Sequence, residues 1–313
     1  MILLSVFLVS YNQEKYIGEA IESIIGQEDI DLRSLQLVVS DDCSTDQTVE
    51  VVESYRSKFP GLLTLNVNSK NLGITKNSNI ALSLCRGKYI AFCAGDDVFM
   101  PRRLASQLDW FTKNPDGVMC TCGVQVFFDE SGIERGPFHD YDCLNNRPIK
   151  MVEQFSQLPT VRFMINRSKV PDIICDERTP VVSDWLLVCE MAMRGRVGGV
   201  KELGVRYRRH INNTTALGAS KSYLDDRLIA IDILFFKYPE LYFSCKKQRC
   251  YTIYKHAKRL YQEGLFRESM RYAFYSICEN KFHIPSYFMF LLPMTGKLGG
   301  RVVKILRSIR KSG

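Results

Sequence analysis

Short apolar runs alternate with amphipathic helical patterns over roughly the first 115 residues, and this alternation is the strongest constraint on the fold. The runs are rich in aliphatic and aromatic residues, whereas apolar residues in the intervening segments recur every three or four positions. Strands are predicted at 2–10, 35–40, 62–67 and 88–93, and helices at 14–27, 47–59, 74–85 and 102–114. Such repeats favour a Rossmann-like α/β fold, with a mostly parallel sheet and helices on both faces.

Polar residues follow three of these predicted strands: Ser10, Tyr11 and Asn12 after the first, Asp41 and Asp42 after the second, and Asp96 and Asp97 after the fourth. Each cluster by itself is also compatible with a turn or a helix cap. Parallel strands present their carboxyl ends at one edge of the sheet, where open α/β sheets bind ligands. The three clusters are therefore expected to meet at that edge.

The acidic character of this edge limits the class of ligand. A divalent cation is commonly held by one or two carboxylates together with the phosphates of its substrate. The first strand is not followed by a Gly-x-Gly-x-x-Gly segment, and no glycine-rich loop ends in Lys-Ser or Lys-Thr. Dinucleotide and P-loop sites are thus disfavoured. The pattern favours a nucleotide diphosphate bridged to the acids by a metal ion.

Four segments resemble the motifs of family 2 glycosyltransferases. These enzymes have the GT-A fold and transfer a sugar with inversion of configuration at its anomeric carbon. The segments are 9–12 (VSYN), 38–46 (VVSDDCSTD), 71–77 (NLGITKN) and 89–97 (YIAFCAGDD). They occur in the order and at the spacing of the family, and the resemblance covers the first ~115 residues. It implies a GT-A domain, a nucleotide-diphospho-sugar donor and a divalent metal, Mn²⁺ or Mg²⁺.

The resemblance also implies roles for individual residues. Asp42, with Asp41 beside it, would hold the base; Ser10, Tyr11 and Asn12 would line the nucleotide; Asp96 would face the ribose; Asp97 would contact the metal and the diphosphate. Lys76 stands where the family often has arginine, so its contact would not be bidentate; a solvated helix face is the alternative. Ala94 stands where many members carry a further acid, which leaves two carboxylates for the metal.

The second half of the chain supplies the predicted catalytic base. Strands are predicted at 117–128 and 160–165, a loop at 129–148, a helix at 184–194 and a strand pair at 197–207. Inverting transfer needs one general base to remove the proton of the acceptor hydroxyl. The resemblance places this base at Asp184, where the family usually has Glu-Asp and this chain has Ser183 before it. The alternative is an acid that stabilises the start of a helix.

Three further residues have predicted contacts with substrate. Trp185 is predicted to stack on the acceptor sugar, with a core tryptophan as the alternative. The segment 206–210 (RYRRH) resembles a Tyr-Arg-x-His segment of the family, so Arg208 and His210 are implied as contacts of the diphosphate leaving group. Arginine suits the charge that develops there, although a lone histidine is often structural.

Positive charge is concentrated in the tail of the chain. The net charge is +8, and residues 221–313 hold 18 Lys+Arg and 7 Asp+Glu. We predict a GT-A domain over 1–215 and a basic helical region over 216–313, with a helical hairpin at 254–260 and 266–277. Apolar residues of 302–309 lie beside basic ones, which suits contact with an anionic membrane surface or packing on the protein's own domain. No RNA-binding motif occurs, so nucleic acid is not an expected partner.

Cysteine usage and hydropathy indicate the compartment. The eleven cysteines are scattered without a disulfide framework, as in a reducing compartment. The apolar start lacks a basic leader and a cleavage site, and no apolar run reaches the ~18 residues of a membrane span. A cytoplasmic protein is expected, at the inner face of the cell membrane if the tail binds lipid.

The leading functional hypothesis is a metal-dependent hexosyltransferase. Its donor would be UDP- or dTDP-linked, and its acceptor a saccharide or lipid-linked saccharide of a bacterial capsule or O-antigen. Two alternatives are a sugar nucleotidyltransferase, which would need a glycine- and basic-rich loop after the first strand, and a nucleotide-sugar-binding protein without catalysis. Replacement of Asp184 by asparagine would distinguish a catalyst from a binding protein.

Overall fold

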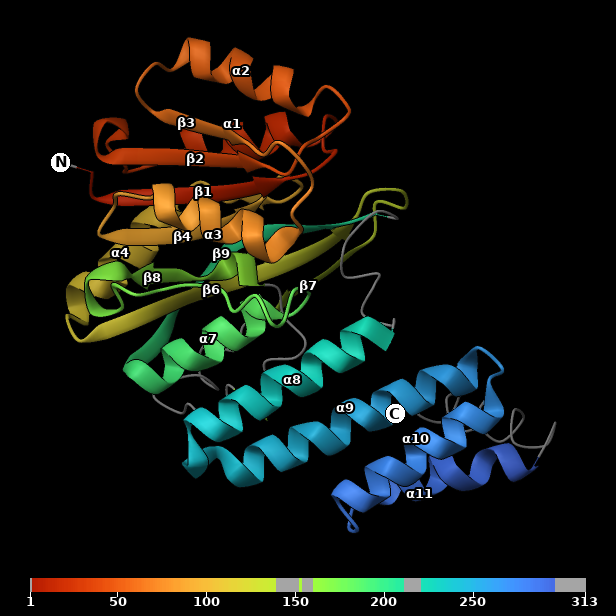
Figure 1. Cartoon of the computed structure of the whole chain (residues 1–313). Helices are drawn as coiled ribbons and strands as arrows, with labels where there is room; N and C mark the ends of the chain where they lie inside the picture. The colour runs from red at the N-terminus through yellow and green to blue at the C-terminus, as the bar shows by residue number, and fades with distance from the viewer. Residues whose placement is uncertain (1, 139–151, 154–159, 211–220, 296–313) are drawn as a thin grey trace. The chain divides into compact units, whose positions relative to one another are not determined.

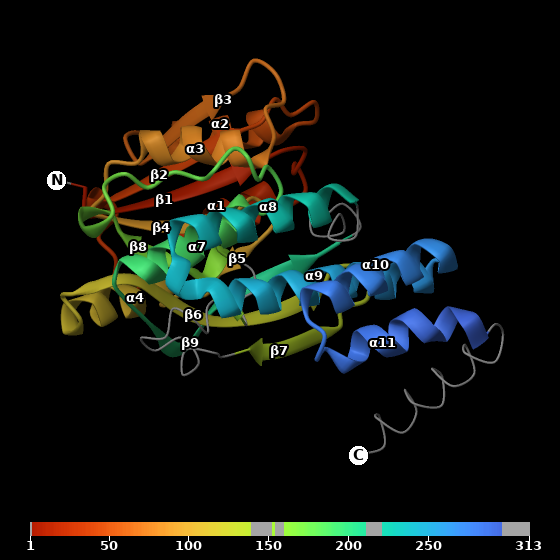
Figure 2. The same cartoon turned by 60° about the horizontal axis from the view of Figure 1, so that its bottom comes forward.

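A computed structural model of the chain describes residues 2–138, 152–153, 160–210 and 221–295. The chain divides into two compact units, Met1–Asn213 and Thr214–Gly313. The first unit contains the β-sheet and the second is built from helices (Figures 1 and 2). None of the described helices is long and apolar enough to span a membrane.

The predicted alternation of strands and helices is confirmed over the first 113 residues. Its strands lie side by side in the order β3-β2-β1-β4, and all are parallel (Figure 1). The elements are β1 (Leu4–Ser10), α1 (Ile17–Ile25), β2 (Leu35–Asp41), α2 (Thr48–Lys58), β3 (Leu63–Val67), α3 (Ile74–Leu84), β4 (Tyr89–Ala94) and α4 (Arg103–Lys113).

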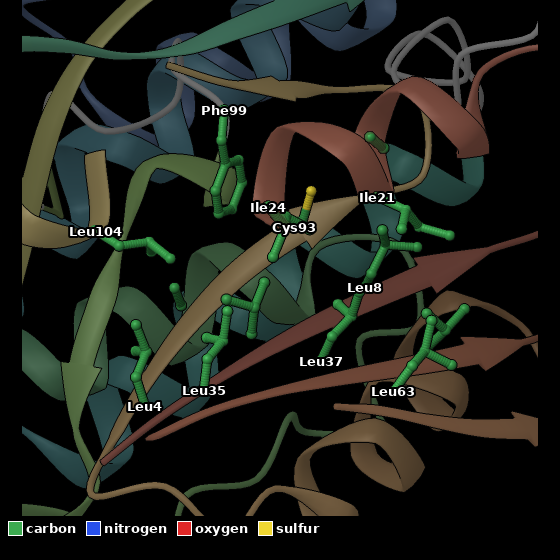
Figure 3. Close-up of a cluster of buried hydrophobic side chains, with 14 of the residues drawn as sticks. Leu4, Leu8, Ile21, Ile24, Leu35, Leu37, Leu63, Cys93, Phe99 and Leu104 are labelled. Carbon is green, nitrogen blue, oxygen red and sulfur yellow. The ribbon is translucent and has the colours of Figure 1, made fainter. Parts of the chain in front are cut away.

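The hydrophobic core lies between one face of this parallel sheet and helices α1, α2 and α4. Alternate residues of each strand point to the same face, so Leu4 and Leu8 of β1 and Leu35 and Leu37 of β2 belong to one buried cluster with Ile21 of α1 (Figure 3). Burying a leucine or isoleucine side chain contributes about 1.5–3 kcal/mol. Helix α3 packs against β1 and β2 on the opposite face. This two-sided burial explains why the strands are continuous apolar runs.

The sheet becomes mixed beyond β4. Its remaining strands are β5 (Val98–Phe99), β6 (Gly117–Phe128), β7 (Glu134–Phe138), β8 (Met164–Asn166) and β9 (Arg196–Arg209), and helix α7 (Ser183–Arg194) precedes β9. The order continues β4-β8-β6-β9-β5. Strand β7 lies off this path and pairs with the second half of β6, at Val124–Phe127. Strand β8 is antiparallel to both β4 and β6, whereas β6 and β9 are parallel.

Three predicted elements of this half differ in the structure. Residues 134–138, predicted as loop, form β7; every residue of this strand is exposed, so no alternation of buried residues marks it. Of the strand predicted at 160–165, only 164–166 is a strand, because Thr160–Arg162 is a 3₁₀ turn. The strand pair predicted at 197–207 is the single strand β9, whose pairing with β6 shifts register.

The second unit consists of α8 (Lys221–Lys237), α9 (Tyr242–Gln262), α10 (Phe266–Glu279) and α11 (Ile284–Leu291). The predicted helical hairpin is confirmed as α9 and α10, joined at Gly264 with φ +81°. Its core contains Ala257, Ala273 and Met289, so small residues let the three helices approach closely. The apolar and basic stripe predicted at 302–309 lies outside the described residues.

Candidate active site

The carboxyl ends of β1, β2 and β4 lie level with one another. Ser10 pairs with Asp41 across β1 and β2, and Val9 pairs with Ala94 across β1 and β4. The polar clusters that follow these three strands therefore emerge together. The structure thus brings the predicted nucleotide-site residues after β1 and β2 to the same edge as Asp96 and Asp97.

Asp41 connects the loops that follow β1 and β2. This buried carboxylate accepts hydrogen bonds from Ser10 Oγ at 2.9 Å, from Ser44 N at 2.7 Å and from Ser44 Oγ at 2.6 Å. Asn12, at φ 52°, donates its N–H to Ser44 Oγ and accepts from Thr45 N at 2.8 Å. Asp41 and Asn12 thereby fix the two loops to each other, and Tyr11, whose residue is 47% exposed, presents its ring at the surface.

Asp42 shapes the loop that leads into α3. Its carboxylate accepts from Leu72 N and Gly73 N at 2.8 Å each and from Asn68 Nδ2 at 2.9 Å. Gly73 has φ +85°, a backbone conformation that favours glycine. Asp42 is buried, so it holds the loop whose backbone borders the site.

Sequence reasoning did not identify a buried amide network behind this loop. Asn77 accepts from Ser40 Oγ at 2.6 Å and from Asn68 Nδ2 at 3.0 Å, and its own amide donates to the Ser40 carbonyl. The weak signal in the sequence was the three asparagines Asn66, Asn68 and Asn71 at and after the end of the third strand. Lys76, the neighbour of Asn77, is exposed and lies 3.9 Å from Glu177, a loose surface ion pair.

Asp96 and Asp97 meet the end of β9. Asp97 has no exposed surface; its Oδ1 accepts from Arg208 N at 3.0 Å, and its Oδ2 finds no hydrogen-bond partner among the described residues. Burial, and then the charge of Asp96, raise the pKa of Asp97 well above its usual range. Asp96 Oδ2 lies 3.0 Å from His210 Nε2, and the His210 ring stacks on Tyr16 at 4.9 Å between centroids.

The guanidinium of Arg208 is held by three protein oxygens. Its Nε donates to the Asp96 carbonyl at 3.0 Å, its Nη1 donates to Asp129 at 2.6 Å, and its Nη2 pairs with Glu19 of α1. The rings of Tyr16 and Phe127 lie 4.7 and 4.6 Å from its Cζ. The bond from Arg208 lowers the pKa of Asp129, which keeps that carboxylate ionised. Three of the five guanidinium N–H groups thus donate to protein oxygens, and the diphosphate contact predicted for Arg208, which stays a prediction, would use the remaining two.

The residues of this edge suit a cation only in combination with a substrate. Among the described residues, no group of three His, Cys, Asp or Glu side chains is placed to hold a metal ion. Asp96 and His210 supply one carboxylate and one imidazole side by side, and phosphate oxygens would complete the shell. Asp97, the predicted metal contact, lies buried behind the backbone of Arg208, so Asp96 is the more accessible carboxylate.

Asp184 stands exposed at the start of α7. Its Oδ2 accepts from Thr160 Oγ1 at 2.7 Å, and its Oδ1 accepts from Trp185 N at 2.6 Å. Thr160 belongs to the 3₁₀ turn, which the buried Arg103 of α4 holds by donating to the Val161 carbonyl. Two separate elements thus orient the carboxylate of Asp184.

A pair of hydroxyls ties the start of α7 to the start of α3. Ser183 Oγ lies 2.6 Å from Thr75 Oγ1, and Thr75 donates to the Pro180 carbonyl at 2.8 Å. Helix α3 begins directly after the loop held by Asp42, so Asp184 lies on the carboxyl side of the sheet. Trp185 is 3% exposed, and its predicted stacking on an acceptor does not fit. The alternative interpretation, a core tryptophan, does.

These features define an α/β domain with Asp96, His210 and, at the start of α7, Asp184 on the carboxyl side of the sheet. Residues 5–170 match the model of the family described as "Glycosyl transferase family 2". The chain therefore belongs to glycosyltransferase family 2.

Several known proteins are similar to this chain. An uncharacterized protein of Mycobacterium tuberculosis is 28% identical over 208 residues, which are 66% of this chain and 59% of that protein. The chain thus matches less than two thirds of that relative's length. The crystal structure of S. aureus TarS 1–349 in complex with UDP-GlcNAc gives a TM-score of 0.65 at 17% identity, covering 96% of this chain and 92% of that one.

A second solved structure supports the same fold. The mannosyltransferase PcManGT from Pyrobaculum calidifontis, in complex with GDP-Man and Mn²⁺, gives a TM-score of 0.58 at 16% identity. The match covers 92% of this chain and 86% of that chain. At these identities the likeness concerns the fold, and the predicted GT-A fold followed by a C-terminal helical region is confirmed.

Proposed function

We propose that this protein transfers a sugar from a nucleotide-diphospho-sugar to a hydroxyl of a saccharide or lipid-linked saccharide, with inversion. The observation that carries the proposal is the pairing of Asp96 with His210 at one point of the carboxyl edge, and the placement of Asp184 at the start of α7 beside α3. The Asp96–His210 pair suits the donor diphosphate, and Asp184 suits an acceptor hydroxyl.

The donor is proposed to lie along the loops after β1, β2 and β4. Its base would contact the ring of Tyr11 and the loop shaped by Asp41 and Asp42, and Lys76 would contribute a point charge. UDP or dTDP is the proposed carrier, and the UDP-GlcNAc bound to TarS and GDP-Man bound to PcManGT support a nucleotide sugar. Asp96 and His210 would hold a Mn²⁺ or Mg²⁺ ion, which supplies positive charge beside the diphosphate.

The chemistry proposed for the protein's own residues is a single displacement. Asp184 takes the proton of the acceptor hydroxyl as its oxygen forms a bond to the anomeric carbon, and the bond from that carbon to the diphosphate oxygen breaks. An aspartate carboxylate has the acceptor oxygens that a general base needs for this proton. The bonds from Thr160 and Trp185 N fix its direction, in a chain where Ser183 replaces the usual neighbouring acid.

The acceptor is proposed to be a saccharide of a bacterial surface glycan such as capsule or O-antigen, modified on the cytoplasmic side of the membrane. A relative supports this class of acceptor. TarS of Staphylococcus aureus, named a poly(ribitol-phosphate) beta-N-acetylglucosaminyltransferase, is 38% identical over 97 residues, 31% of this chain and 17% of that protein.

The proposal is tested by measuring the melting temperature with a panel of nucleotide sugars, with Mn²⁺ or with EDTA. A ligand that binds the native state raises the melting temperature, so at least one UDP- or dTDP-sugar should do so. A panel without any stabilising nucleotide sugar would contradict the proposal.

Asp184→Asn separates catalysis from binding. The variant should retain the ligand-induced rise in melting temperature, because Asp184 lies outside the proposed nucleotide contacts. Release of UDP or dTDP in the presence of acceptor should fall about 10²–10⁴-fold, the usual contribution of a general base. Unchanged turnover would remove Asp184 from the mechanism, and binding without turnover in the unmodified protein would favour a non-catalytic binding protein.

A further inference from the structure

Helix α11 carries an apolar face that no described residue covers. We call it the α11 face, and it consists of Ile284, Tyr287, Phe288 and Leu291 of the helix (Ile284–Leu291), with Phe282 just before it and Met294 in the 3₁₀ turn just after it. Phe282 is 91% exposed and Phe288 is 65% exposed. Soluble proteins rarely leave a contiguous apolar patch in water, and such patches mark interaction surfaces.

The inward side of α11 already supplies the packing that holds the helix. Ser286 and Met289 are buried, and Ser286 Oγ lies 2.7 Å from Ser276 Oγ of α10. The ring of Phe290 lies 6.2 Å from that of Phe274 on α10, and α10 and α11 lie side by side in both views (Figures 1 and 2). The exposed aromatic and aliphatic side chains are therefore surplus to the fold of this unit.

The length of the apolar segment excludes a membrane span. Residues 282–296 contain no Asp, Glu, Lys or Arg, but α11 itself has only 8 residues, whereas a span needs about 20. A short helix with one apolar side and basic flanks lies in the plane of a membrane surface, with that side at the boundary of the acyl chains.

Positive charge predominates in the stretch of sequence that contains the α11 face. Residues 280–313 contain seven Lys+Arg and no Asp or Glu. Lys281 is exposed beside the face, and Arg267 and Arg271 are exposed on α10, with Glu268 the exposed acid there. Basic residues next to an apolar surface complement the anionic headgroups of a membrane leaflet.

We propose that the α11 face docks this protein onto an anionic lipid membrane. Its rings and aliphatic chains enter the headgroup boundary while Lys281 contacts the headgroups. RNA would stack on the rings but gain little from Ile284, Leu291 and Met294. A second copy of the chain would bring like charges together. This docking is independent of sugar transfer, and it would place the enzyme where lipid-linked acceptors occur.

The test is co-sedimentation of the full chain with vesicles of phosphatidylcholine alone or mixed with phosphatidylglycerol. Binding is expected to the mixed vesicles and to weaken with salt. Phe288→Ser combined with Leu291→Ser should lower the partition coefficient at least about tenfold, because two apolar side chains lose their burial. A matched control is Phe236→Ser combined with Phe243→Ser, at positions 78% and 81% exposed on α8 and α9, which should bind as the unmodified protein does.

The other outcomes overturn the proposal. The proposal fails if the protein shows no preference for anionic vesicles, or if the control double variant loses vesicle binding as much as the α11 double variant does. It also fails if polyuridylate displaces the vesicles, or if the protein is a dimer in solution that the α11 double variant dissociates. Both double variants should keep the melting temperature and its rise with nucleotide sugar, because the replaced side chains are exposed. Failure of that rise with intact vesicle binding would contradict the proposed function and leave the docking surface standing.

Discussion

Asp41, Asp42, Asp96 and Asp97 form two adjacent pairs in the sequence, yet each of the four side chains has different surroundings. Asp41 accepts from serine hydroxyls and Asp42 from backbone N–H groups, so both hold loops. Asp97 is buried against the backbone of Arg208, whereas Asp96 faces an imidazole. The same residue type thus holds a loop, lies buried against the backbone or pairs with an imidazole, according to what surrounds it.

Thr160 is expected to position the proposed base. In Thr160→Val the hydroxyl that donates to Asp184 is lost while the shape of the side chain is kept. Misorientation of a catalytic group reduces turnover with little effect on substrate binding, so kcat should fall about tenfold or more with KM nearly unchanged. Steady-state kinetics check this, with Thr160→Ser as the control that keeps the hydroxyl and should retain kcat. Equal kinetics in both variants would show that Thr160 does not orient Asp184.

Metal binding is expected to require the nucleotide sugar. Asp96 and His210 give two protein ligands, too few to hold Mn²⁺ tightly without phosphate oxygens. Calorimetry should detect weak or no binding of Mn²⁺ alone, and donor affinity should fall at least about tenfold on addition of EDTA. In His210→Ala the effect of EDTA should shrink, whereas in Lys76→Ala, which alters an exposed side chain away from this pair, it should persist. Tight binding of Mn²⁺ in the absence of donor would contradict the assignment.

At the scale of elements, the connection between α3 and β4 passes very close to the backbone of β1. This contact fixes where β4, the fourth parallel strand, begins. Gly87 donates its N–H to Ser5 Oγ at 2.8 Å. A Cβ at Gly87 would lie 2.4 Å from Ser5 N and 2.7 Å from the Leu4 carbonyl carbon, both in the backbone of β1. The backbone of a central strand has little freedom to move aside.

Gly87→Ala should therefore destabilise the protein by about 1–3 kcal/mol, the usual cost of overpacking. Urea unfolding measures the change. Gly18→Ala is the control, since a Cβ there meets Tyr55 Oη at an ordinary 3.4 Å and alanine in a helix gains about 0.5–1 kcal/mol over glycine. A Gly87→Ala variant as stable as the control would mean that this connection can move.

The elements that sequence reasoning located are those with a strong burial pattern. Strands β1, β2 and β4 are apolar runs that are almost entirely buried. Strand β6 has apolar residues at Val118, Cys120, Cys122 and Val124 in its sequence, and its first eight residues are buried. Strand β7 is exposed along its whole length and carries no such pattern. The ion pairs of Arg208 with Glu19 and Asp129 were not predictable either, because the tertiary fold alone brings these residues together. Trp185 could not be placed from the sequence, because the direction of a side chain at a helix start depends on what packs above it.

At the scale of the whole molecule, buried thiols set the alkaline limit of stability. Burial raises the pKa of Cys85 and of Cys175 to about 12, and raises those of Cys93, Cys120 and Cys122 as well. An unfolded cysteine ionises near pH ~8.5, so below that pH the thiols are neutral in both states and have no effect. Above it the unfolded chain loses protons that the folded protein retains, so stability falls as pH rises.

The free energy of unfolding should drop by about 1.4 kcal/mol per fully buried thiol between pH 7.5 and pH 9.5. Urea titrations at the two pH values measure this drop. The double variant Cys85→Ala, Cys175→Ala should show a smaller drop, and Cys278→Ala, which removes an exposed thiol, should show the same drop as the unmodified protein. A pH-independent free energy of unfolding would contradict this account.

The contacts of Arg208 with Asp97, Asp129 and Glu19 also have a consequence for biosynthesis. The family match ends at residue 170, but the arginine that covers Asp97 and fixes Asp129 and Glu19 comes from β9, some forty positions later. While a ribosome is still making that segment, the site proposed for the donor lacks the contacts of Arg208 with Asp97, Asp129 and Glu19. A nascent chain should therefore acquire affinity for its sugar donor only after residue 210 has emerged from the exit tunnel, however early the parallel strands have assembled.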